Sequence, residues 1–202
     1  MTRKSRNKPL KSVIGIYCEG QSEVEYFKML RRKYRGGNVR THQVGLEIES
    51  MESMKETKLI TEIIDKVGPL KRKKQVNAVF AVFDRDDLKQ DDIQLAQALA
   101  KKNGIKIIFS SIDFEIWILL HFQFFTRAYT KNDLNRLLSG SKYFNQDYRI
   151  FKGSEYDRYL SDRVKVAVEN AKKLAQSQNN LLTDNPFVNI QNYIKEIFGR
   201  DD

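Results

Sequence analysis

The stretch VNAVFAVFDRDD, Val76–Asp87, contains the clearest strand pattern in the chain. Its first part, Val76–Phe83, is short, rich in Val and Phe and bounded by polar residues, which predicts a buried strand. Asp84 and Asp86 follow that strand at once, and alternate positions of an extended chain place their side chains on one side. The stretch therefore predicts a strand that ends in a pair of neighbouring carboxylates.

Comparable apolar segments lie on both sides of this strand, separated by segments of helical periodicity. The other predicted strands are Ser12–Cys18, Val39–Ile48 and Ile105–Phe109. The predicted helices between them are Ser22–Tyr34, Ser53–Val67 and Asp91–Lys102. Strands that alternate with helices indicate an α/β fold, with a mostly parallel sheet flanked by helices. Functional sites of such sheets lie at the carboxyl ends of the strands.

Two details concern the ends of the predicted helices. Ser22 and Glu25 are spaced as a capping box, which predicts that the first helix begins at Ser22. Gly68-Pro69 is expected to end the helix that starts near Ser53.

The pattern becomes helical after Phe114. Phe114–Phe122 is apolar nearly all round, which predicts a buried helix. A short helix is expected to end at Gly140. Two further helices are expected over Tyr159–Gln176 and Pro186–Phe198, the last with Asn185 as its N-cap.

The 202 residues divide into a basic flexible arm (1–11), a core (12–122) and a helical C-terminal extension packed on that core (123–202). The chain carries 36 Lys and Arg against 26 Asp and Glu, which gives a formal net charge of +10. This balance favours a polyanionic partner, either nucleic acid or an acidic membrane surface. The arm and a second basic cluster are expected to follow a phosphate backbone without reading its sequence. That cluster consists of Lys71, Arg72, Lys73 and Lys74.

Cysteine content and hydropathy exclude several classes of protein. Cys18 is the single cysteine and lies in an apolar run, so it is expected to be a buried strand residue. One cysteine permits neither a disulfide framework nor a zinc cluster. The longest apolar run, Ile116–Leu120, is too short to cross a bilayer. We expect a cytoplasmic protein without a membrane partner, and the chain shows no Gly-rich nucleotide-binding motif.

Acidic residues gather at the predicted ends of two strands. Glu19 follows the first strand, and Glu23 lies one turn into the next helix. If the first and third strands are neighbours, these side chains meet Asp84 and Asp86 in one crevice. Carboxylates crowded in a basic protein indicate a site for a hard divalent cation. We expect one or two Mg²⁺ ions, with Mn²⁺ as an alternative, that activate water against a phosphodiester.

Three further residues each allow two interpretations. Glu115 opens the apolar helix after the fourth strand, either as a ligand of a second metal or as an ordinary first-turn acid. Lys152 is a candidate for contacting phosphate, with an ordinary surface lysine as the alternative. His121 is expected to be a hydrogen-bonded core residue rather than a metal ligand.

Several motifs resemble those of the RloB-like family of Toprim-type nucleases, which is related to OLD-type nucleases and AbiLii abortive-infection proteins. EGQSE at Glu19–Glu23 resembles the opening motif, and VFDRDD at Val82–Asp87 resembles the D-x-D strand. FEIWILLHF at Phe114–Phe122 is the motif specific to the family. The likeness covers roughly residues 12 to 198. The segment before Phe114 departs from it, because SSIDFE stands where the family commonly has S-N-P-x-F-E.

The resemblance implies a Toprim-like catalytic core over 12–122 and metal-dependent cleavage of nucleic acid. It also implies a role in phage defence, linked to restriction or abortive infection, and an ATPase encoded nearby as a partner. The implied catalytic residues are Glu19, Asp84 and Asp86. The implied metal ligands are these three with Glu23 and Glu115.

Other functions remain open at this stage. The chain is too short for a topoisomerase and lacks the zinc module of a primase, and D-x-D phosphatases usually carry that motif after their first strand. An RNA-cleaving toxin, an RNA-processing Toprim ribonuclease and an inactive nucleic-acid-binding partner of an ATPase stay as alternatives. The choice between DNA and RNA, the cleavage specificity and the oligomeric state are also open.

Overall fold

The computed structural model describes residues 13–44, 55–73 and 75–200. The predicted basic arm, Lys74 and the second half of the predicted strand Val39–Ile48 lie outside these ranges.

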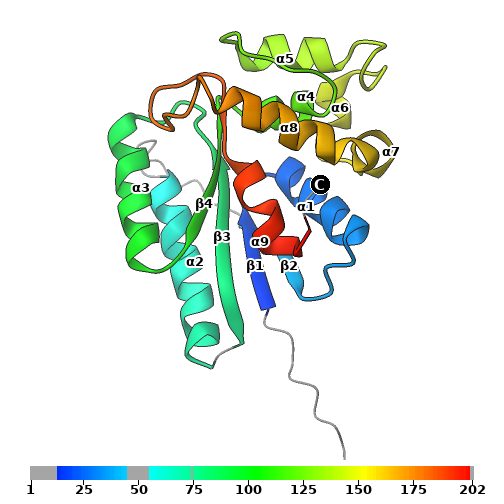
Figure 1. Ribbon diagram of the computed structural model, residues 1–202. Helices are drawn as coiled ribbons and strands as arrows, with labels where there is room; N and C mark the ends of the chain where they lie inside the picture. Colours follow the sequence, from blue (N-terminus) through cyan, green and yellow to red (C-terminus); the bar gives the residue numbers. More distant parts are fainter. Residues whose placement is uncertain (1–12, 45–54, 74, 201–202) are drawn as a thin grey trace, which may run out of the picture.

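A mostly parallel sheet forms the centre of the fold (Figure 1). Its strands are β1 (Val13–Cys18), β2 (Val39–Gln43), β3 (Val76–Asp84), β4 (Lys106–Ser111) and β5 (Phe187–Val188). They are ordered β2-β1-β3-β4-β5. The first four run parallel, and β5 pairs antiparallel with β4. The predicted α/β class is confirmed, and β1 lies beside β3 as the acidic crevice requires.

Helices cover both faces of the sheet because its strands are apolar on both sides. Successive residues of β1 enter different cores: Ile16 packs in one cluster and Tyr17 in the other. Helices α2 (Lys55–Arg72) and α3 (Gln90–Lys102) cover one face, and α1 (Gln21–Lys33) and α9 (Ile194–Phe198) cover the other (Figure 1).

A group of short helices stands over the carboxyl ends of the strands (Figure 1). At its centre is α4 (Glu115–Leu120), all of whose residues are buried, as the apolar pattern predicted. Around it lie α5 (Lys131–Leu138), α6 (Tyr148–Phe151), α7 (Asp157–Leu160) and α8 (Val164–Leu174). Because this group covers the end of the sheet where parallel α/β proteins place their sites, it contributes side chains to any pocket there.

The predicted helix over Pro186–Phe198 is wrong. The Asn185–Pro186 peptide is cis, Phe187 and Val188 form β5, and α9 begins only at Ile194. Phe187 pairs with Ser111 at the edge of the sheet and packs its ring 6.2 Å from that of Phe109. Pairing with an open sheet edge outweighs the helical pattern of this segment.

Three predicted helix ends differ from the structure. Helix α1 has Gly20 as its N-cap without a side-chain cap, while Glu25 accepts hydrogen bonds from Gln21 and Lys28, so the Ser22 capping box is wrong. Helix α2 continues through Pro69 to Arg72, because a proline in the last turn removes few helical hydrogen bonds. The predicted helix Tyr159–Gln176 is divided into α7, a 3₁₀ turn at Ser161–Arg163, and α8.

Candidate functional site

A pocket of about 290 Å³ opens at the carboxyl ends of β1 and β3. The neighbouring strands keep their pairing to this point, since Glu19 N donates to Val82 O across 3.1 Å. The structure thus brings together the acids predicted to meet here. The pocket is lined by Glu19, Gly20, Gln21, Ser22, Glu23, Asp84, Asp86, Lys131, Lys152 and Gly153.

Glu23 enters the pocket from the first turn of α1 and is 4% exposed. Burial, followed by the charges of Glu115 and Glu19, raises its pKa to about 7, against the lowering effects of a backbone hydrogen bond and of Lys152. Gly20 makes room for this carboxylate, because a Cβ there would lie 2.5 Å from Glu23 Oε2. The turn EGQSE therefore places a buried acid directly beside the end of β1.

Asp84 ends β3 and accepts a hydrogen bond from Phe114 N at 3.2 Å. Burial of its carboxyl, followed by the charges of Glu23, Glu115 and Glu19, raises its pKa well above the ordinary value. Asp84 is thus the point where acids from β1, α1 and α4 act on one another. Its negative charge is costly here unless a cation or a proton compensates it.

Asp86 does not continue the extended chain, so the expected alternation of Asp84 and Asp86 is wrong. The strand ends at Asp84, and Asp86 has a left-handed backbone with φ of 43°, a region that Asp tolerates better than most residues. Arg85 N donates to Ser110 O at 2.9 Å and Asp86 N to Ile112 O at 3.0 Å, which attaches the turn to the end of β4 and the residue that follows it. Asp86 still lines the pocket, where it forms an ion pair with Lys131.

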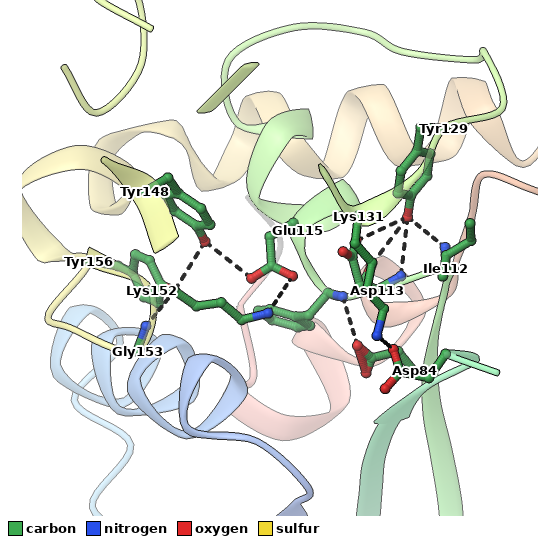
Figure 2. A network of polar contacts seen from close by, with 12 residues as sticks. Asp84, Ile112, Asp113, Glu115, Tyr129, Lys131, Tyr148, Lys152, Gly153 and Tyr156 are labelled. Carbon is green, nitrogen blue, oxygen red and sulfur yellow. Dashed lines mark hydrogen bonds and ion pairs between the residues drawn. The ribbon is translucent and has the colours of Figure 1, made fainter. Parts of the chain in front are cut away.

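Glu115 is fully buried at the start of α4. Its Oε2 accepts a hydrogen bond from Lys152 Nζ at 3.0 Å, and its Oε1 accepts one from Tyr148 Oη at 3.4 Å (Figure 2). Tyr148 Oη also lies 3.2 Å from Tyr156 Oη. Because Glu115 interacts electrostatically with Glu23 and Asp84 as well, it belongs to the acidic group rather than to an isolated helix start.

Lys152 follows α6 and reaches the pocket from the helical extension. Burial opposes its charge, but Glu115, Asp113 and Asp84 outweigh that effect and raise the pKa of Lys152. The surrounding acids therefore favour its charged form. Its side chain is 42% exposed and its ammonium pairs with the buried Glu115. The expected contact with phosphate stays a prediction.

Sequence reasoning missed two residues at this site. Lys131, the first residue of α5, lines the pocket and pairs with Asp86, and nothing in its local sequence signals this. Asp113 is 1% exposed, and burial, then the charge of Glu115, raises its pKa to about 7. Its Oδ1 accepts from Tyr129 Oη at 3.3 Å (Figure 2), whereas its Oδ2 has no hydrogen-bond partner among the residues that the structure describes. The departure from the family pattern before Phe114 lies at Ser111 and Ile112, so it gave no signal for Asp113.

The predicted basic cluster lies elsewhere. Lys71 and Arg72 end α2 at the opposite end of the sheet, where Lys71 Nζ donates to Asn103 O at 2.7 Å and Gly104 O at 3.2 Å. Nine residues of β3 at ~3.3 Å each put roughly 30 Å between them and the pocket. Lys73 is exposed just beyond α2, and Lys74 lies outside the described ranges. Among the described residues, Lys71, Arg72 and Lys73 do not line the acidic pocket.

His121 and Cys18 belong to the core, as expected. His121 is fully buried, with Nδ1 2.9 Å from Trp117 O and Nε2 3.1 Å from Tyr26 Oη. A carbonyl oxygen only accepts, so Nδ1 carries the proton and Nε2 accepts from the tyrosine. Burial lowers the pKa of His121 to about 3. Cys18 is buried and free.

The carboxylates of the pocket are chemically suited to bind a divalent cation. Across residues 13–44, 55–73 and 75–200, no three His, Cys, Asp or Glu side chains are already arranged around one metal position. Carboxylate oxygens are nevertheless the ligands that Mg²⁺ and Mn²⁺ prefer, and a cation would relieve the repulsion that raises the pKa values of Glu23 and Asp84. The residues present therefore fit such an ion, although Lys131 and Lys152 now neutralise two of the acids.

Comparison with known proteins adds a family. The family model described as RloB-like protein matches residues 14–197, from β1 to α9. The chain belongs to the RloB-like family. The matched segment contains every residue of the pocket. No match was found among curated proteins or among solved structures. In the described part of the chain, every helix is too short or too polar to cross a membrane.

Proposed function

We propose that this protein is a metal-dependent nuclease that hydrolyses phosphodiester bonds of nucleic acid. The observation that supports this most strongly is the convergence of Glu19, Glu23, Asp84 and Asp86 on one pocket, with Glu115 buried beside it. Buried acids that raise one another's pKa values lower the stability of the fold, and such groups are typical of functional sites. A bound cation would compensate their charges.

The residues of the pocket would divide the work. Glu19, Asp84 and Asp86 would hold Mg²⁺ or Mn²⁺, with Glu23 and Glu115 as further candidate ligands. When bound, such an ion neutralises charge on a phosphate and makes water a better nucleophile. Lys152 would contact the phosphate of the substrate through its ammonium. Glu115 accepts a hydrogen bond from Lys152 and another from Tyr148, and so holds the lysine in place.

The surroundings of the pocket fit a polyanionic substrate. The net charge of +10 attracts nucleic acid over long distances, and the acids in the pocket would be screened by the bound ions. From the resemblance, we extend the proposal to a role in phage defence, linked to restriction or abortive infection, with an ATPase encoded nearby as a partner.

Cleavage assays test the proposal. Supercoiled plasmid, single-stranded DNA and bulk tRNA would each be incubated with Mg²⁺, Mn²⁺ or EDTA. We expect metal-dependent cleavage that Asp84→Asn lowers at least a hundredfold, because that change removes a central charge at nearly constant shape. Asp87→Asn is the matched control, since Asp87 is exposed in the same turn and does not line the pocket.

The pattern of products decides between the open alternatives. Cleavage of tRNA alone would favour the ribonuclease. A folded protein that binds metal but cleaves none of these substrates would indicate activation by a partner. A folded protein that binds no metal and cleaves nothing would contradict the proposal.

A further inference from the structure

The two lysines of the pocket are held very differently. Lys152 donates a hydrogen bond to Glu115, whose side chain has no exposed surface and also accepts a hydrogen bond from Tyr148 Oη. Lys131 pairs with Asp86, and 44% and 42% of these two side chains are exposed. Ion pairs surrounded by water contribute about 1 kcal/mol or less, because solvent screens them. Lys152 is therefore anchored, whereas Lys131 is easily displaced.

The position of Lys131 is not explained by the stability of its helix. Lys131 is the first residue of α5, where the partial positive charge of the helix end disfavours a cation. The capping box of Thr130 and Asp133 already satisfies this end of the helix. Outside α5, its ammonium forms an ion pair with Asp86.

Asp86, in contrast, is held by its backbone. Its N–H donates to Ile112 O at 3.0 Å, and the turn closes with Leu88 N donating to Arg85 O at 2.8 Å. These bonds hold the Asp86 backbone at the edge of the pocket independently of the lysine. Lys131 has a flexible four-carbon stem, so it can leave Asp86 without any movement of α5.

We propose that Lys131 competes with the divalent cation for Asp86, and that metal binding transfers its ammonium from Asp86 to a phosphate of the bound strand. This inference rests on the proposed function and specifies how the same site passes from its metal-free to its substrate-bound form. Lys131 lines the same pocket as Lys152, so both ammonium groups border the space a phosphate would enter. Asp86 would be neutralised by Lys131 before an ion binds and by the ion afterwards.

The first test is a calorimetric titration of the full chain with Mn²⁺, comparing wild type, Lys131→Met and Lys142→Met. Lys142 is exposed outside the acidic pocket, so its variant measures the general effect of one lost positive charge. We expect Lys131→Met to bind Mn²⁺ about fivefold more tightly, the worth of losing a competitor in an exposed ion pair, and Lys142→Met to stay within about twofold of wild type. Lys131→Arg keeps the charge and should resemble wild type.

The second test measures binding of a fluorescent oligonucleotide in Ca²⁺ by anisotropy. Lys131→Met should bind it about fivefold more weakly despite its tighter hold on metal, because the phosphate loses one ammonium contact. Equal metal affinity in wild type and Lys131→Met would overturn the inference and leave the proposed function intact. Metal binding by Lys131→Met but not by wild type would support it. Failure of all variants to bind metal would overturn both proposals.

Discussion

Lys152 donates a hydrogen bond to Glu115 across 3.0 Å, and this contact joins the end of α6 to the start of α4 at the carboxyl edge of the sheet. The two residues lie far apart in the chain and meet only because the helical extension packs over β1 and β3 (Figure 1). Lys152 is the most firmly held countercharge of the acidic group, since Asp113 and Asp84 also act on it. Its removal should reveal how much repulsion the group contains.

Replacing Lys152 with Met should destabilise the protein. Glu115 would lose its cationic partner in a site without solvent, and we expect a loss of about 1 to 2 kcal/mol, discounted because the lysine itself is 42% exposed. Urea unfolding at pH 8 measures the change. Lys142→Met is the control, and equal stability of the two variants would refute the role of Lys152 as a countercharge.

Glu23→Gln should stabilise the protein at high pH and not at low pH. The pKa of Glu23 rises from 4.5 to about 7 on folding, so the folded state holds a proton that the unfolded state has released. The stability from this group is therefore complete below pH 4.5 and is lost as pH rises through 7. We expect the variant to exceed wild type by on the order of 2 kcal/mol at pH 8.5 and to approach it at pH 5. Unfolding in urea across this range checks the prediction, and a difference independent of pH would contradict it.

His121→Leu should affect stability and leave metal binding unchanged. The substitution leaves Tyr26 Oη and Trp117 O without their partner in the core, at a cost of about 2 kcal/mol. The free energy of unfolding and the affinity for Mn²⁺ would be measured on the same preparation. A loss of metal affinity in a folded variant would make His121 a ligand and the interpretation as a core residue wrong.

Neutralising Arg72 and Lys73 together should weaken binding of long nucleic acid only. These residues lie at the far end of the sheet, roughly 30 Å from the pocket by the length of β3. A duplex of about 40 base pairs can reach both places, whereas a single strand of about three nucleotides is too short to do so. We expect a reduced salt dependence for the long duplex and no change for the short strand. Equal weakening of both would indicate that the cluster acts at the pocket itself.

The acidic half of the site followed from local patterns. Apolar runs predicted β1, β3 and β4, and parallel neighbours align their carboxyl ends, so Glu19 and Glu23 were expected beside Asp84. The geometry of Asp86 was not predictable in this way, because its left-handed backbone depends on hydrogen bonds to Ser110 and Ile112 in a distant segment.

The basic half of the site depends on tertiary packing. Lys131 and Lys152 come from short helices whose position over the sheet is set by burial of α4, and no periodicity of their own sequence signals their partners. The same limit explains the error at Phe187–Val188, where an open edge of β4 determines the structure. Local patterns predicted the four parallel strands, while contacts between remote segments determined β5 and the basic half of the site.

Titration with Mn²⁺ directly tests whether the acidic pocket is a metal site. Calorimetric titration of wild type, Asp84→Asn and Asp87→Asn at pH 8 would report the number of sites and their affinities. We expect one or two Mn²⁺ sites in wild type and in Asp87→Asn, and an affinity for Mn²⁺ at least tenfold lower in Asp84→Asn. A folded wild type that binds no Mn²⁺, or an Asp84→Asn variant that binds it equally well, would contradict the assignment of this pocket as a metal site.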